Sequence, residues 1–153
     1  MELALAGKTS EDVAARLPDG SFGMARETAQ FIHRALADGV PGGLGFGASV
    51  GKAIASSKAR YRKKSLIGEA YRLGVPVTVH VAVGADIVHM HPEADGAAIG
   101  EGSLRDFRTF CSLVAGLSGG VYLNVGSAVI LPEVFLKALS LSRNLGHDVR
   151  NFT

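Results

Sequence analysis

The chain has 153 residues, 47% hydrophobic and 20% charged, which is enough for one domain with an apolar core. Its 16 Lys and Arg residues nearly balance its 14 Asp and Glu residues, so no strong field attracts nucleic acid or an anionic membrane. We expect a cytoplasmic protein, because the single cysteine, Cys111, lies in an apolar run and neither a membrane span nor a secretory signal is recognisable.

The first half of the chain is predicted to be helical. Apolar residues at helical spacing predict helices over residues 2–17, 23–39, 46–56 and 63–74. The buried face predicted for the second of these helices consists of Met24, Thr28, Phe31, Ile32, Ala35 and Leu36.

The pattern changes period after Gly74. Residues 75–83, VPVTVHVAV, are rich in β-branched side chains and predict a buried strand, with Pro76 near its start where a missing N–H is tolerated. His80, inside this strand, is expected to be a buried histidine with a satisfied hydrogen bond. The remaining chain predicts a loop over 84–102 with one possible helical turn, a helix over 102–117 capped by Ser103, a strand over 120–125, a helix over 132–145 and a short third strand over 148–153.

Strands that alternate with helices predict an α/β fold, a doubly wound parallel sheet with flanking helices, in one domain over residues 1–153. Two strands and a short third are too few for such a sheet, because apolar strands need covered faces and paired edges. We therefore expect that neighbouring strands are missing from the chain or come from another subunit.

The glycine-rich stretch GGLGFGASVGKAI does not match a phosphate-binding loop. Gly45 is one residue too far from Gly51, Ala53 follows Lys52, and the stretch follows a helix instead of a strand. A glycine-rich helix start that packs closely is the favoured interpretation. The basic run KARYRKK over residues 58–64 is interpreted as a solvated helix edge.

The loop after the first strand carries the residues most suited to chemistry. His89 could serve as an acid or base, since imidazole titrates near neutrality. Asp86 suits a ligand contact near a strand end, and an ordinary turn-forming role explains it equally well. An alternative hypothesis, a metal-dependent hydrolase, would use His89 and His91 with an acid from Glu93, Asp95 or Glu101.

A second candidate region follows the second predicted strand. Gly126 and Ser127 form a predicted sharp turn at its end, where open α/β sheets bind ligands. Glu133 lies near the start of the next helix, where the helix dipole alone explains an acid, but its position beside the presumed pocket keeps it a candidate catalytic group.

The chain resembles the deoxyhypusine synthase superfamily, most closely an uncharacterised bacterial branch, in the order of three features: GVPVTVHVAVGADI, an amphipathic helix and GVYLNVGSAVILPEVFLKALSLSRNLG. The segment DGSFGMARETAQ also resembles that family. The resemblance implies a Rossmann-like NAD-binding fold in a homotetramer. In the true synthases it implies transfer of an aminobutyl group from spermidine to a protein lysine. By position, the resemblance assigns NAD contacts to Gly84, Ala85, Asp86, Gly126 and Ser127.

The chain departs from the family at several positions. The histidine pair that follows the glycine turn in the synthases falls on Pro132 and Glu133, and a family acid falls near His89, so both changes argue against spermidine. The reactive lysine would come after residues 149–153, and the first cofactor-binding strands would precede Met1. The resemblance thus implies an internal fragment of a polypeptide roughly twice as long.

Three hypotheses for function follow. The first is an NAD-binding protein of the deoxyhypusine synthase-like type, with amine or aminoalkyl group transfer in the intact protein and His89 or Glu133 as acid or base groups. The second is the metal-dependent hydrolase. The third is a non-catalytic assembly subunit whose exposed strand edges pair with a partner chain.

Overall fold

The computed structural model describes residue 18 and residues 26–153, so the predicted helix over residues 2–17 lies outside the described residues. Within the described ranges the chain forms α-helices and short 3-10 helices, and no β-strand. These elements are α3 (Arg26–Gly39), α4 (Phe46–Ser56), η1 (Arg62–Lys64), α5 (Leu66–Leu73), η2 (Ile87–Met90), α6 (Gly96–Ala115) and α7 (Ile130–Asn144).

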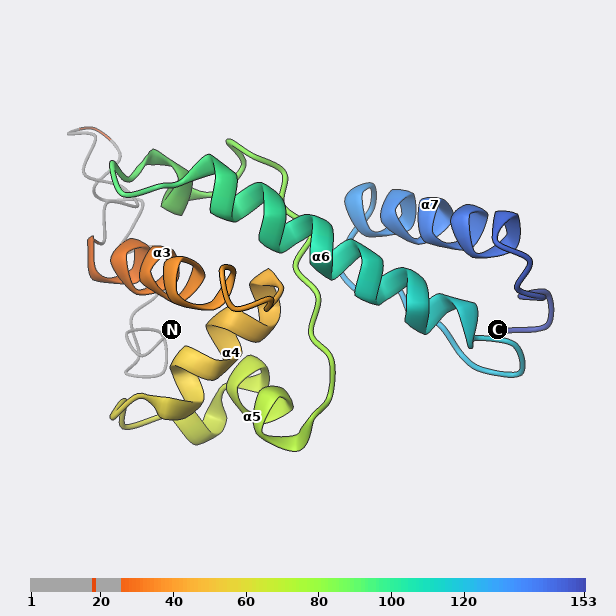
Figure 1. Cartoon of the computed structure of the whole chain (residues 1–153), viewed down its shortest axis with the longest axis horizontal. Helices are drawn as coiled ribbons and strands as arrows, with labels where there is room; N and C mark the ends of the chain where they lie inside the picture. The colour runs from red at the N-terminus through yellow and green to blue at the C-terminus, as the bar shows by residue number, and fades with distance from the viewer. Residues whose placement is uncertain (1–17, 19–25) are drawn as a thin grey trace.

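The predicted α/β fold, a Rossmann-like doubly wound parallel sheet, is therefore wrong for the described chain. Residues 75–83 and 120–125 run between helices without helical turns, as predicted, but they do not join in a sheet (Figure 1). In the first segment, the N–H groups of Val79 and Val81 bind side chains of α6 instead of a neighbouring strand. Because a strand is defined by its pairing, apolar alternation predicts extended chain but does not supply the partner.

The predicted helices agree with the structure more closely than the predicted strands do. The structure confirms the predicted helix over 46–56 as α4, and α5 begins after Ser65, whose hydroxyl accepts a hydrogen bond from the Gly68 N–H. The structure corrects the start of the helix predicted over 102–117, because α6 begins at Gly96 and is capped by Asp95, upstream of Ser103. A side-chain acceptor at the first free N–H groups explains why the helix starts there.

The helix α6 joins two hydrophobic cores. Its first half packs with α3 and α4, whereas its second half packs with α7 (Figure 1). Its 20 residues correspond to a length of about 30 Å, enough to serve two separate cores. The first core contains Ala35, Leu36, Val40, Phe46, Val50 and Ile99, and the second contains Cys111, Val114, Phe135, Ala138, Leu139 and Val149.

The buried face of α3 differs in part from the prediction. Ala35 and Leu36 are buried as expected, but Phe31 is 38% exposed. His33 is buried instead, and its Nε2 lies 2.8 Å from the carbonyl oxygen of Val88. The hydrogen bond to η2 explains the difference, because it satisfies a polar ring on a face that hydrophobicity alone assigns to apolar residues.

Candidate functional site

The predicted catalytic residue His89 has a local structural role. Its Nδ1 accepts hydrogen bonds from the N–H groups of Gly84 and Asp86, at 3.1 Å and 3.3 Å, and Asp86 accepts one from the N–H of Val88. Together Asp86 and His89 form a reciprocal cap on η2. Since Nδ1 is an acceptor, the proton of a neutral ring lies on Nε2, which leaves Nε2–H as a donor and no free base.

The residues of the metal hypothesis are not brought together. In residues 26–153 no group of at least three His, Cys, Asp or Glu side chains could hold a metal ion. Each candidate has its own neighbour: His91 accepts a hydrogen bond from the Glu93 N–H and stacks on His33, Asp95 caps α6, and Glu101 pairs with Arg105. Glu93 is fully exposed, and the hydrogen bond from Gln30 lowers its pKa.

The glycine turn before α7 has a similar capping role. Gly126 has a φ of 76°, a left-handed conformation that favours glycine. Ser127 accepts a hydrogen bond from the Leu131 N–H through its hydroxyl and another from the Asn124 side chain through its carbonyl. Glu133, the second predicted catalytic residue, forms an exposed ion pair with Lys137 one helical turn away.

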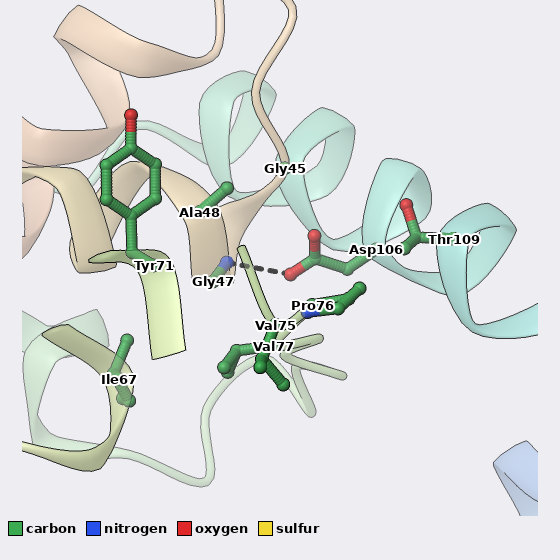
Figure 2. A pocket seen from close by; sticks show the side chains of 10 residues that line it. All are labelled: Gly45, Gly47, Ala48, Ile67, Tyr71, Val75, Pro76, Val77, Asp106 and Thr109. Atoms are coloured by element: carbon green, nitrogen blue, oxygen red, sulfur yellow. Dashed lines mark hydrogen bonds between the residues drawn. The ribbon is translucent and has the colours of Figure 1, made fainter. Parts of the chain in front are cut away.

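The residues assigned to NAD do not form a common cavity. One cavity of about 110 Å³ lies beside Gly47 and Asp106 (Figure 2). Another of about 340 Å³ lies between His80 and the start of α7. Neither cavity is lined by Gly84, Ala85, Asp86, Gly126 or Ser127. A Cβ at Gly84 or Gly126 would meet no atom within 4 Å, so the backbone at both positions is open to solvent.

Asp106 is a buried charged residue that the sequence reasoning missed. Its Oδ2 accepts a hydrogen bond from the Gly47 N–H at 2.8 Å (Figure 2). It accepts another from the Val79 N–H, also at 2.8 Å, and the residue is 3% exposed. Burial raises the pKa of this carboxyl, and the two backbone hydrogen bonds oppose the rise. The sequence feature that could have indicated this residue is an acid on the apolar face of an amphipathic helix, next to Phe107.

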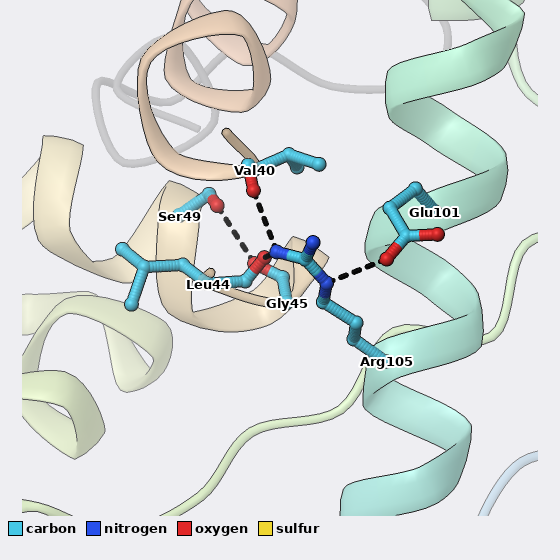
Figure 3. Close-up of polar contacts among 6 residues, drawn as sticks. All are labelled: Val40, Leu44, Gly45, Ser49, Glu101 and Arg105. Carbon is cyan, nitrogen blue, oxygen red and sulfur yellow. Dashed lines mark hydrogen bonds and ion pairs between the residues drawn. The ribbon is translucent and has the colours of Figure 1, made fainter. Parts of the chain in front are cut away.

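A second polar cluster holds the turn between α3 and α4 against α6. Arg105 donates a hydrogen bond from Nη1 to the Val40 carbonyl at 2.5 Å and forms an ion pair with Glu101 at 2.7 Å (Figure 3). Ser49 donates a hydrogen bond to the Gly45 carbonyl at 2.7 Å. These contacts satisfy the carbonyls at the end of α3 and the start of α4, so the cluster is structural.

The glycines of α4 confirm the close packing predicted for GGLGFGASVGKAI. A Cβ at Gly45 would lie 1.8 Å from Asp106 Oδ1, and one at Gly47 would lie 2.0 Å from the Val77 carbonyl oxygen. Glycine at both positions allows α4 to approach α6 and residues 75–83. This geometry does not support a phosphate-binding loop, because these glycines lie against protein atoms.

Residues 75–83 are held along one side only. Val79 and Val81 bind Asp106 and Ser103 of α6, and Ser103 also donates to the Val79 carbonyl. Successive backbone groups of an extended chain point in opposite directions. The backbone groups of Thr78 and His80 therefore point away from α6, and they have no hydrogen-bond partner among the described residues. The side chain of His80 is half-buried against Phe107 and Phe110, and burial lowers its pKa. The predicted hydrogen bond is present, to the Thr78 hydroxyl at 3.0 Å, but the ring is less buried than expected.

Residues 120–125 are also held along one side. The carbonyl of Gly120 accepts from the Thr153 N–H, and the N–H of Tyr122 donates to the Thr153 carbonyl, at 3.1 Å and 2.7 Å. The backbone groups of Val121, Leu123 and Val125, which we call the open edge, have no partner in the described part of the chain. Their side chains are 63%, 78% and 81% exposed.

Comparison with known proteins adds no relative. No family model, no curated protein and no solved structure matches the chain. Among the helices that the structure describes, none combines the length and the apolar character needed to cross a membrane.

Proposed function

We propose that this chain is an assembly subunit that associates with further copies of itself through its extended segments. The observation that carries the proposal is the open edge: three residues whose backbone groups have no partner among the described residues also expose apolar side chains. An edge of this kind is a template for pairing with another chain. Assembly is one of the three hypotheses that the sequence left open, and the described contacts favour it over the other two.

The composition around the open edge supports association. Residues 119–132 contain no Asp, Glu, Lys, Arg or His. Proteins that keep an edge strand from pairing usually place charged side chains or proline on it. Pro132 is the first proline after Gly119 and lies within α7, so nothing in this segment prevents a second chain from approaching.

Magnitudes indicate a reversible oligomer. Full burial of a Val or Leu side chain contributes about 1.5–3 kcal/mol, and each copy offers Val121, Leu123 and Val125. Association costs about 4–15 kcal/mol in lost freedom of motion and side-chain ordering. Since the two quantities are comparable, the degree of association is expected to depend on protein concentration.

The other two hypotheses have less support. The metal hypothesis lacks a group of ligands in the described residues. NAD binding, and amine or aminoalkyl transfer by the intact protein, stay predictions that rest on the resemblance to deoxyhypusine synthases, because the assigned residues line no described cavity.

Sedimentation velocity over a hundredfold range of concentration tests the proposal. The parent chain is expected to shift from smaller to larger species as concentration rises. Leu123→Lys is expected to shift this transition to at least about tenfold higher concentration, because a charge must then be desolvated in the interface and faces its own copy.

Leu73→Lys is the matched control. Leu73 is also an exposed leucine, 63% exposed on α5, and the substitution adds the same charge away from the open edge. A parent chain that stays a compact monomer at every concentration would overturn the proposal, as would equal effects of the two lysine variants.

A further inference from the structure

The hydrogen bonds of residues 119–125 define how a second copy can approach. Gly120 and Tyr122 face residues 151–153 of the same chain, so that side of the segment is already occupied. The open edge lies on the opposite side, because Val121, Leu123 and Val125 alternate with the occupied residues. The backbone groups of these three residues are therefore available to an incoming chain.

We propose that residues 121–125 of two copies pair in antiparallel orientation about a two-fold axis at Leu123. This inference rests on the proposed function and names the partner as a second copy in a defined register. Leu123 then lies opposite Leu123 of the partner subunit, and Val121 lies opposite Val125 of the partner subunit. Each facing pair exchanges both of its backbone hydrogen bonds, which is the narrow arrangement of an antiparallel ladder.

The neighbouring residues exclude the other registers. A shift by one residue places an outward backbone group opposite an inward one, so the ladder cannot form. A shift by two residues places Val125 opposite Gly119, or Val121 opposite Ser127. Gly119 has a φ of 78° and donates its N–H to Asn151, and Ser127 lies beyond the left-handed turn at Gly126. Only the register centred on Leu123 pairs all three outward residues.

The side chains suit a two-fold contact between identical copies. Val121, Leu123 and Val125 share one face of the segment, so the proposed pairing forms a continuous apolar row across both copies. The opposite face is fixed within each copy, since the Tyr122 ring stacks on Phe135 with centroids 3.9 Å apart. A two-fold axis brings each residue near its own copy, and the absence of charge over residues 119–132 removes like-charge repulsion.

Disulfide trapping tests the register. In the proposed pairing, facing Cα atoms lie about 5.5 Å apart, within the range of about 4.4–6.8 Å that a disulfide spans. Under mild oxidation, Leu123→Cys is expected to form a covalent dimer with itself. Val121→Cys is expected to form one when mixed with Val125→Cys but not alone, because two copies of position 121 are offset by about 14 Å.

Two controls accompany the trapping. The parent chain, whose Cys111 is buried, and Leu73→Cys on α5 are expected to remain uncrosslinked at the same concentration. Circular dichroism checks that each variant keeps the helix content of the parent, which these exposed positions should allow.

The outcomes separate the register from the proposed function. If the parent chain associates but Leu123→Cys forms no covalent dimer, the register is wrong and the assembly proposal stands. Self-crosslinking of Val121→Cys alone would also overturn the register. If the parent chain is monomeric at every concentration, both proposals are wrong.

Discussion

Asp106 links three separate parts of the chain through a single carboxyl group. It comes from α6, and its two hydrogen bonds reach Gly47 at the start of α4 and Val79 in the segment after α5. Without these bonds, the buried N–H of Gly47 and the partly buried N–H of Val79 would lose their acceptor, at a cost of about 1–3 kcal/mol each. The residue thus fixes residues 75–83 against the helices.

The raised pKa of Asp106 predicts a pH dependence of stability. Because the folded chain binds the proton more tightly than the unfolded chain, this carboxyl contributes most to the free energy of unfolding below its ordinary pKa of 3.8. Its contribution is lost as pH rises through the raised pKa of the folded state. The free energy of unfolding of the parent, minus that of Asp106→Asn, should therefore fall as pH rises over this window.

Urea unfolding at a series of pH values measures this difference. Asp148→Asn, which removes an exposed carboxyl that pairs with Arg150, controls for general effects of charge. A difference between parent and Asp106→Asn that rises with pH would contradict the prediction, and would mean that the hydrogen bonds from Gly47 and Val79 outweigh burial.

Two glycines offer a matched test of close packing. A Cβ at Gly47 would lie 2.0 Å from a backbone oxygen of Val77, so Gly47→Ala is expected to destabilise the fold by about 1–3 kcal/mol. Gly100, within α6, has nothing within 4 Å of a Cβ, so Gly100→Ala is expected to stabilise by up to about 1 kcal/mol. Chemical denaturation measures both; equal effects would show that the approach of α4 to residues 75–83 is not required.

At the scale of elements, the helices and the extended segments differ in what the sequence encodes. The predicted α4 was confirmed from its apolar period and flanking glycine, because a helix makes its backbone hydrogen bonds within itself. The extended segments were located but their partners were not. Val79 and Val81 bind residues 27 and 22 positions away on α6, respectively, and no local pattern specifies such distant partners.

The same distinction applies to the candidate site. The turn at Gly126 was predicted from its residues, and its φ of 76° agrees with a glycine turn. The hydrogen bonds that occupy His89 and Ser127 could not be predicted, since the acceptors and donors depend on where η2 and α7 begin. The open edge was foreseen only as strands lacking neighbours, because exposure is a property of the folded chain.

At the scale of the whole molecule, the NAD prediction can be tested separately from assembly. If the resemblance to deoxyhypusine synthases holds, calorimetric titration of the parent with NAD should give a heat of binding. Gly126→Val should abolish it, because a β-branched residue is strained at a positive φ. Gly146→Val, at a φ of 89° after α7, is the control for strain alone. The absence of heat from the well-folded parent would make the NAD prediction wrong.

The sequence by itself determined the helices apart from the start of α6, the two extended segments and the glycine turn at Gly126, because these depend on residues close together along the chain. Only the tertiary structure decided that residues 75–83 bind α6, that α6 serves two cores, and that residues 120–125 keep one side open. The physical reason is that a helix completes its hydrogen bonds locally, whereas an extended segment must find its partners elsewhere in the fold.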